Sequence, residues 1–154
     1  MHGRLFEIRE ERIPQDEWVN EFSFCDEDTS SWCDWMCDSA DREDDLKWLK
    51  KVLPTSIFKV DGDEIEIISD GREFVEKWIE DVRELVNRLD YESFTGYAST
   101  WAIERTLQNM IGSDFMFRTS YADYAHGSTE FIKYCINSGK GTKLYVCGII
   151  DYHY

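Results

Sequence analysis

Hydrophobic and charged residues alternate near the start of the chain, where Phe6 and Ile8 would lie on the same side of a strand. Such alternation is typical of a strand with one buried face, so we expect a strand over Arg4–Ile13. Pro14 ends this pattern. Because proline suits the first turn of a helix, a short helix should follow to about Phe22.

The clearest helical pattern lies in the middle of the chain. Apolar residues there recur at three- and four-residue steps, which places them on one face of a helix: Phe74, Val75, Trp78, Ile79, Val82, Leu85, Val86 and Leu89. We expect this face to pack against the core. Shorter patterns of the same kind predict helices from Asp41 to Pro54, over Ser99–Ile111, and from Ser128 to Gly139.

Strand-like runs fill much of the remaining chain. Ile57–Val60 and Glu64–Ile68 flank an Asp-Gly turn, which is a strong signal for a β-hairpin. Phe115–Thr119 and Lys143–Asp151 are further predicted strands, whereas Cys25–Ala40 has no regular period and should be irregular or form short helical turns. The order β-α-α-β-β-α-α-β-α-β predicts a single α+β domain over 1–154. Its mixed or antiparallel sheet should have about five strands, packed by amphipathic helices.

Composition indicates a folded protein that does not enter membranes. Of 154 residues, 42% are apolar and 15% aromatic, so the high charge does not imply disorder. No window approaches the roughly 18 apolar residues needed to cross a bilayer, and we expect no secretory leader. Five irregularly spaced cysteines fit reduced thiols better than a disulfide framework, so a cytoplasmic location is expected.

The formal net charge of −15 is concentrated in one part of the chain. Residues 93–154 hold five acids and five bases, and are therefore neutral. In contrast, Asp16–Asp45 holds twelve acids and one base, Arg42, which gives a net charge of −11 in thirty residues. Such a field repels nucleic acid and anionic lipid, so the charge predicts a basic protein as the partner.

Aromatic residues are interspersed among these acids, and aromatics are enriched at the centres of protein interfaces. We therefore predict that this segment is a partner-binding surface, formed by Asp16, Glu17, Glu21, Asp26, Glu27, Asp28, Trp32, Asp34, Trp35 and Asp38. Such a surface would suit an inhibitor that docks on a protein that itself handles nucleic acid. It could be an immunity protein against a toxin nuclease, or a mimic of the phosphate backbone.

Two other functions remain open on the sequence. The domain could have a structural or scaffold role, with core aromatics and with acids that serve only solubility. Alternatively, His126 could act as the base of a hydrolase-like enzyme, with a cysteine as nucleophile, although no nucleophile motif surrounds it. We expect no metal and no cofactor, because Cys25, Cys33 and Cys37 lack a fourth ligand nearby in sequence.

Overall fold

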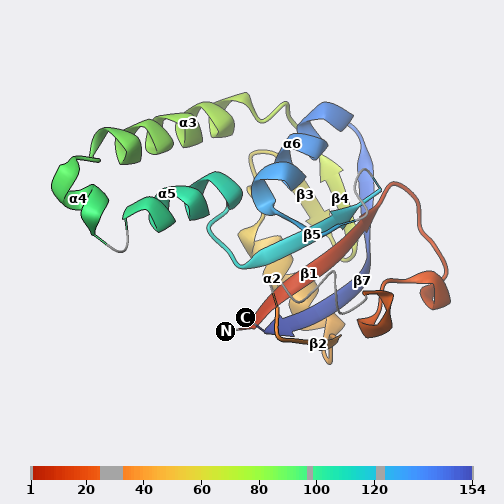
Figure 1. Ribbon diagram of the computed structural model, residues 1–154. Helices are drawn as coiled ribbons and strands as arrows, with labels where there is room; N and C mark the ends of the chain where they lie inside the picture. Colours follow the sequence, from red (N-terminus) through yellow and green to blue (C-terminus); the bar gives the residue numbers. More distant parts are fainter. Residues whose placement is uncertain (1, 25–32, 97–98, 121–123, 154) are drawn as a thin grey trace.

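Two long strands from the two ends of the chain lie side by side in the middle of the sheet. The computed structural model describes residues 2–24, 33–96, 99–120 and 124–153 (Figure 1). Strand β1 (His2–Arg9) runs antiparallel to β7 (Lys143–His153) and parallel to β5 (Phe115–Thr119). These three strands bury most of the apolar residues that the alternating patterns predicted.

Shorter strands extend this centre on both sides. Along its free edge, β7 pairs first with β4 (Glu64–Ile67) and then, near its end, with β2 (Trp35–Asp38). The hairpin partner of β4 is β3 (Phe58–Asp61), and β6 (His126–Gly127) pairs with β5. The described residues form an open, mixed sheet of seven strands, which confirms the α+β class and adds two strands to those expected.

Each face of the sheet is covered by different elements. Helices α2 (Arg42–Val52) and α6 (Ser128–Ser138) pack on one face, where the ring of Phe131 stacks on Phe117 with centroids 4.0 Å apart. Burying an aromatic ring of this size stabilises the fold by roughly 1.5–3 kcal/mol. The other face holds a smaller cluster that includes Val19. None of the described helices is long and apolar enough to span a bilayer.

Three helices form an arm that projects from the sheet (Figure 1). They are α3 (Arg72–Asn87), α4 (Tyr91–Thr95) and α5 (Ser99–Gln108). The predicted position of α3 is confirmed, but the expectation that it faces the core is wrong, because none of its residues is buried. Only Phe74 at its start packs on the core; further along, the Trp78 Nε1 donates to the carbonyl of Thr106 in α5 at 3.1 Å.

Two local predictions near the acidic segment are also wrong. Instead of one helix to Phe22, the chain forms two single 3₁₀ turns, η1 (Gln15–Glu17) and η2 (Glu21–Ser23). The break comes at Asn20, whose side chain caps the second turn by accepting from the Phe22 N–H at 2.9 Å. Within Cys25–Ala40, which was expected to be irregular, β2 is a strand because the free edge of β7 pairs with it; residues 25–32 lie outside the described chain.

A β-bulge interrupts the pairing of β1 with β7. Phe6 and Ile8 lie in register with β7, but two residues of β7, Cys147 and Gly148, lie opposite Glu7 alone. An alanine Cβ at Gly148 would lie 2.2 Å from the carbonyl oxygen of Val19, so only glycine allows the two backbones to approach this closely.

The carboxylate of Glu7 is fully buried at this bulge, where it accepts hydrogen bonds from nearby backbone N–H groups. Its Oε2 accepts from the N–H of Gly148 at 3.0 Å and from the N–H of Val19 at 2.8 Å. Its Oε1 accepts from the Arg9 guanidinium at 2.6 Å. One side chain therefore joins β1, the bulge and the segment that carries η1 and η2.

We expect Glu7→Gln to lower the free energy of unfolding by about 2–4 kcal/mol, because an amide cannot accept through both atoms and weakens the charge-assisted bonds. Urea denaturation would measure the loss. Glu11→Gln is the matched control, since Glu11 is exposed, and should change stability by less than about 0.5 kcal/mol. Equal losses in the two variants would contradict the anchoring role of Glu7.

Candidate functional site

Arg42, the single base of Asp16–Asp45, directs its charge inward. Its guanidinium donates to the carbonyl oxygens of Val146, at 2.6 Å, and of Cys147 at the bulge. The same group lies 4.3 Å from the ring centroid of Trp18. Burial lowers the pKa of Arg42 from its ordinary value. Arg42 forms no ion pair with any acid in the described part of the chain.

The acids that belong to α2 are compensated by other bases. Asp45 is buried and accepts from the Arg4 Nε at 2.8 Å. Lys47 lies 3.2 Å from Glu43 and 3.0 Å from Asp44, which raises the pKa of Lys47. Among the described acids of Asp16–Asp45, those without a lysine or arginine partner therefore lie before α2.

The structure brings six of the ten predicted site residues to the region of η1, η2 and β2. These six, which we call the acidic surface, are Asp16, Glu17, Glu21, Asp34, Trp35 and Asp38, and all are exposed or partly exposed. The other four, Asp26, Glu27, Asp28 and Trp32, lie outside the described residues. The acidic surface therefore draws on residues from both sides of the 25–32 segment.

Backbone and side-chain contacts hold these parts together. The Glu21 N–H donates to the Asp38 carboxylate at 2.8 Å, which ties η2 to β2. Asp34 lies 2.8 Å from His153 Nδ1 at the end of β7, and this hydrogen bond lowers the pKa of Asp34. In the described part of the chain, Asp16 and Glu17 form no ion pair. The acidic surface thus combines anchored and free carboxylates.

The aromatic residues of the segment divide into two groups. Trp18 is half-buried under Arg42, and Phe24 and Met36 pack on the second face of the sheet. These residues fit the structural role that the sequence left open. Phe22 and Trp35, by contrast, are 87% and 49% exposed. Two large apolar side chains therefore stand beside the carboxylates, where a partner can reach them.

A hollow of about 320 Å³ opens between η1, β2 and the start of α2. Its lining includes the acidic side chains of Asp16 and Asp38, together with Asn20 and the inward-turned Arg42. A hollow of this size has room for one side chain of a docked protein.

The residues of the enzymatic alternative show little of the required chemistry. His126 is partly buried, its Nε2 is buried and has no hydrogen-bond partner among the described residues, and burial lowers its pKa. Burial also raises the pKa of the thiols of Cys135 and Cys147, which disfavours the reactive thiolate. Among the described residues, no group of three or more His, Cys, Asp or Glu side chains is arranged to hold a metal ion.

The anchoring roles of Glu7 and Arg42 were not predicted from the sequence. Glu7 interrupts a run of apolar residues in a strand, and Arg42 is the only base among twelve acids. Each is an exception to its local pattern, and a buried charge must be paired or hydrogen-bonded to be tolerated. These two departures from the local pattern could have indicated anchoring residues. They do not indicate which groups on β7 the two side chains bind.

The lowered pKa of His126 predicts a pH-dependent contribution to stability. Below about pH 6.5, its ordinary pKa, the unfolded chain binds a proton at this position more readily than the folded protein does, so acid favours unfolding. In His126→Phe, the free energy of unfolding should therefore fall less between about pH 7.5 and about pH 5.5 than in the wild type. Denaturant unfolding at both pH values measures this, and identical falls would contradict it.

Comparison of the chain with protein-family models, with curated proteins and with solved structures finds no match in any of the three. Its function therefore has to be inferred from the chemistry of its own residues.

Proposed function

We propose that this chain is a small binding or inhibitor protein that docks its acidic surface onto a basic protein, one that itself handles nucleic acid. The inward position of Arg42 carries this proposal, because the only base of the segment is used to satisfy backbone carbonyls of β7. The carboxylates before α2 are then left without a counter-charge from their own segment.

An acidic surface of this kind acts mainly on the rate at which a partner associates. Like charges gathered on one surface destabilise the folded state, and solubility alone does not require that they be gathered. A basic partner relieves the repulsion and is steered towards the surface, which speeds association. An immunity protein and a mimic of the phosphate backbone both bind a basic nucleic-acid site in this way, and both fit the proposal.

The exposed aromatic residues supply the second part of the proposed interface. Phe22 and Trp35 lie among the carboxylates, and buried aromatic anchors surrounded by a polar rim carry most of the free energy of many interfaces. The charges would set the rate and the choice of partner, while these two side chains would slow dissociation.

A scaffold role without a charged partner is the second candidate. The inward packing of Phe24 and Met36 favours it, since these residues serve the fold. This role predicts that no protein is captured in a salt-dependent manner.

Neutralising the acidic surface should slow association. The immobilised protein would capture partners from a lysate of its source organism at low and high salt, and a protein lost at high salt would be identified by mass spectrometry. With that purified partner at low salt, the triple variant Asp16→Asn, Glu17→Gln, Glu21→Gln should associate about tenfold more slowly.

The matched control removes three exposed acids from the arm, through Glu73→Gln, Glu80→Gln and Glu92→Gln. Its association rate should stay within about twofold of the wild-type rate. If both triple variants slow equally, total charge rather than the acidic surface sets the rate. An association rate indifferent to salt would refute the proposal.

Trp35→Ala should separate binding from stability. The side chain is about half exposed at an edge strand, so its loss should weaken capture of the same partner at least about tenfold while hardly changing the melting temperature. Phe117→Ala is the core comparison and should cost roughly 3–5 kcal/mol of stability. A comparable loss of stability in Trp35→Ala would assign this tryptophan to the fold.

A further inference from the structure

The arm leaves an apolar face of α3 only partly covered. Val75, Trp78, Val82 and Leu85 recur at alternating steps of three and four residues, the spacing by which helices pair in coiled coils. Within the arm, α5 packs on this helix, but at ten residues it extends about 15 Å against about 24 Å for α3. Helix α3 is therefore longer than the helix that packs on it, and the four residues of its apolar stripe remain partly exposed.

The tip of the arm, at the far end of α3, exposes large apolar side chains. Tyr91 and Phe94 of α4 are 83% and 62% exposed, Trp101 of α5 is 57% exposed, and Val86, near the end of α3, is 47% exposed. From the usual size of aromatic side chains, the three rings expose on the order of 400 Å². This area is comparable to the largest apolar patch on a typical monomer, which is often a functional surface.

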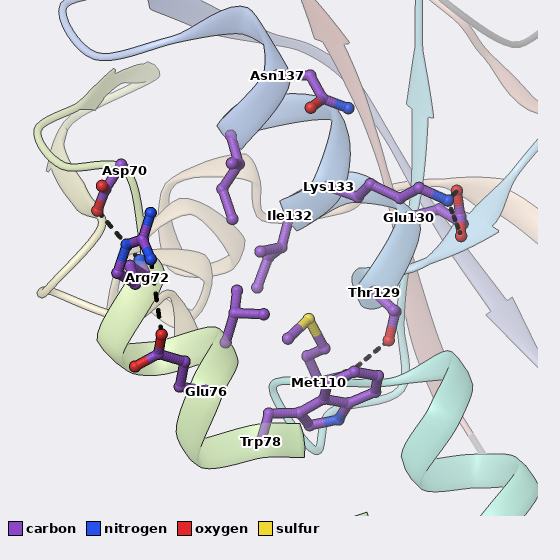
Figure 2. Close-up of a pocket in the computed structure, with 12 residues that line it drawn as sticks. Asp70, Arg72, Glu76, Trp78, Met110, Thr129, Glu130, Ile132, Lys133 and Asn137 are labelled. Carbon is purple, nitrogen blue, oxygen red and sulfur yellow. Dashed lines mark hydrogen bonds and ion pairs between the residues drawn. The ribbon is translucent and has the colours of Figure 1, made fainter. Parts of the chain in front are cut away.

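A hollow of about 690 Å³ lies at the opposite end of α3, between this helix and α6. Figure 2 shows Trp78, Met110 and Ile132 pointing into it, with charged side chains around the outside. The charges at the rim are paired, as Lys133 lies 3.2 Å from Glu130. The floor is therefore apolar and the rim nearly neutral.

We propose that a second copy of this chain pairs with the arm, with the two α3 helices antiparallel, so that the tip of each copy fills the hollow of the other. The arrangement follows from the position of tip and hollow at opposite ends of one helix. A two-fold axis across the middle of α3 places each tip over the other copy's hollow. Such an interface is isologous and closes at two copies.

The charge of the arm is compatible with a second copy as the occupant. The stretch 72–89 contains five acids and four bases, and Lys77 with Asp81 and Arg88 with Glu84 form ion pairs along it. Over the whole arm, 72–108, eight acids and five bases give a net charge of −3, so two arms repel each other much less than two Asp16–Asp45 segments of net charge −11 would. In Figure 1 the arm projects away from β2, so pairing through it also keeps the acidic surfaces apart.

The available area is sufficient for a dimer. The exposed rings of two tips would remove about 800 Å² from water, before the walls of the two hollows are counted. Stable interfaces bury roughly 1,200–2,000 Å² in total. The tips alone thus supply about half of what is required, and the hollows and α3 stripes supply the remainder.

Sedimentation equilibrium of the full chain, from about 1 to about 100 µM, tests the pairing. The wild type should form a dimer with a Kd on the order of micromolar. Phe94→Asp should raise that Kd at least tenfold, since it places a charge in the hollow of the other copy. Phe22→Asp is the matched control, because Phe22 is equally apolar and 87% exposed but lies in η2, and its Kd should stay within about twofold.

Circular dichroism would show whether both variants fold, as we expect for substitutions at exposed positions. A wild type that stays monomeric throughout this range would overturn the proposal, as would a dimer that Phe22→Asp weakens and Phe94→Asp does not.

Crosslinking tests the geometry: in the double variant Tyr91→Cys, Asn137→Cys, oxidation should join position 91 of one copy to position 137 of the other. Links only between two positions 91 would refute the antiparallel arrangement.

Discussion

Two residues of β7, Cys147 and Gly148, occupy the length that Glu7 alone occupies on β1, and the backbone groups displaced at this bulge need partners. Two opposite charges provide them. Glu7 accepts from the Gly148 N–H, and Arg42 donates to the carbonyls before it. A buried polar group without a partner costs about 1–3 kcal/mol, so this solution stabilises the centre of the sheet. The same two side chains also hold Val19 and Trp18, which fix the position of η1.

The acidic surface thus depends on how the backbone groups at the β-bulge are hydrogen-bonded. Arg42 satisfies backbone carbonyls, so it is not available to pair with the carboxylates that surround it in sequence. Acids further along, in α2, have lysine or arginine partners and contribute little net field. The division between compensated and uncompensated acids therefore follows the fold rather than the number of charges in the segment.

Much of the fold was predictable because its signals are local. The hairpin, α2, α6, β5 and β7 each follow from a repeating apolar pattern or a turn within a few residues. Strand β2 was not predictable from its own sequence. It forms because β4 pairs only with the start of β7, which leaves the edge of β7 near its end free to pair with β2. The pattern of α3 revealed an apolar face but not what covers it. For the candidate site, the sequence located the acids, whereas the orientations of Trp35 and Arg42 depend on contacts with β7.

Strand β7 follows every other described element in the sequence, yet β1, β2 and β4 all pair with it. Its register with β1 joins His2 to His153, nearly the full length of the chain apart. Contacts between residues so distant in sequence slow folding, because the loop between them must close first. During synthesis, β1 is made first but cannot complete its pairing until β7 has left the ribosome. The apolar faces of the early strands would then remain accessible to chaperones until β7 is made.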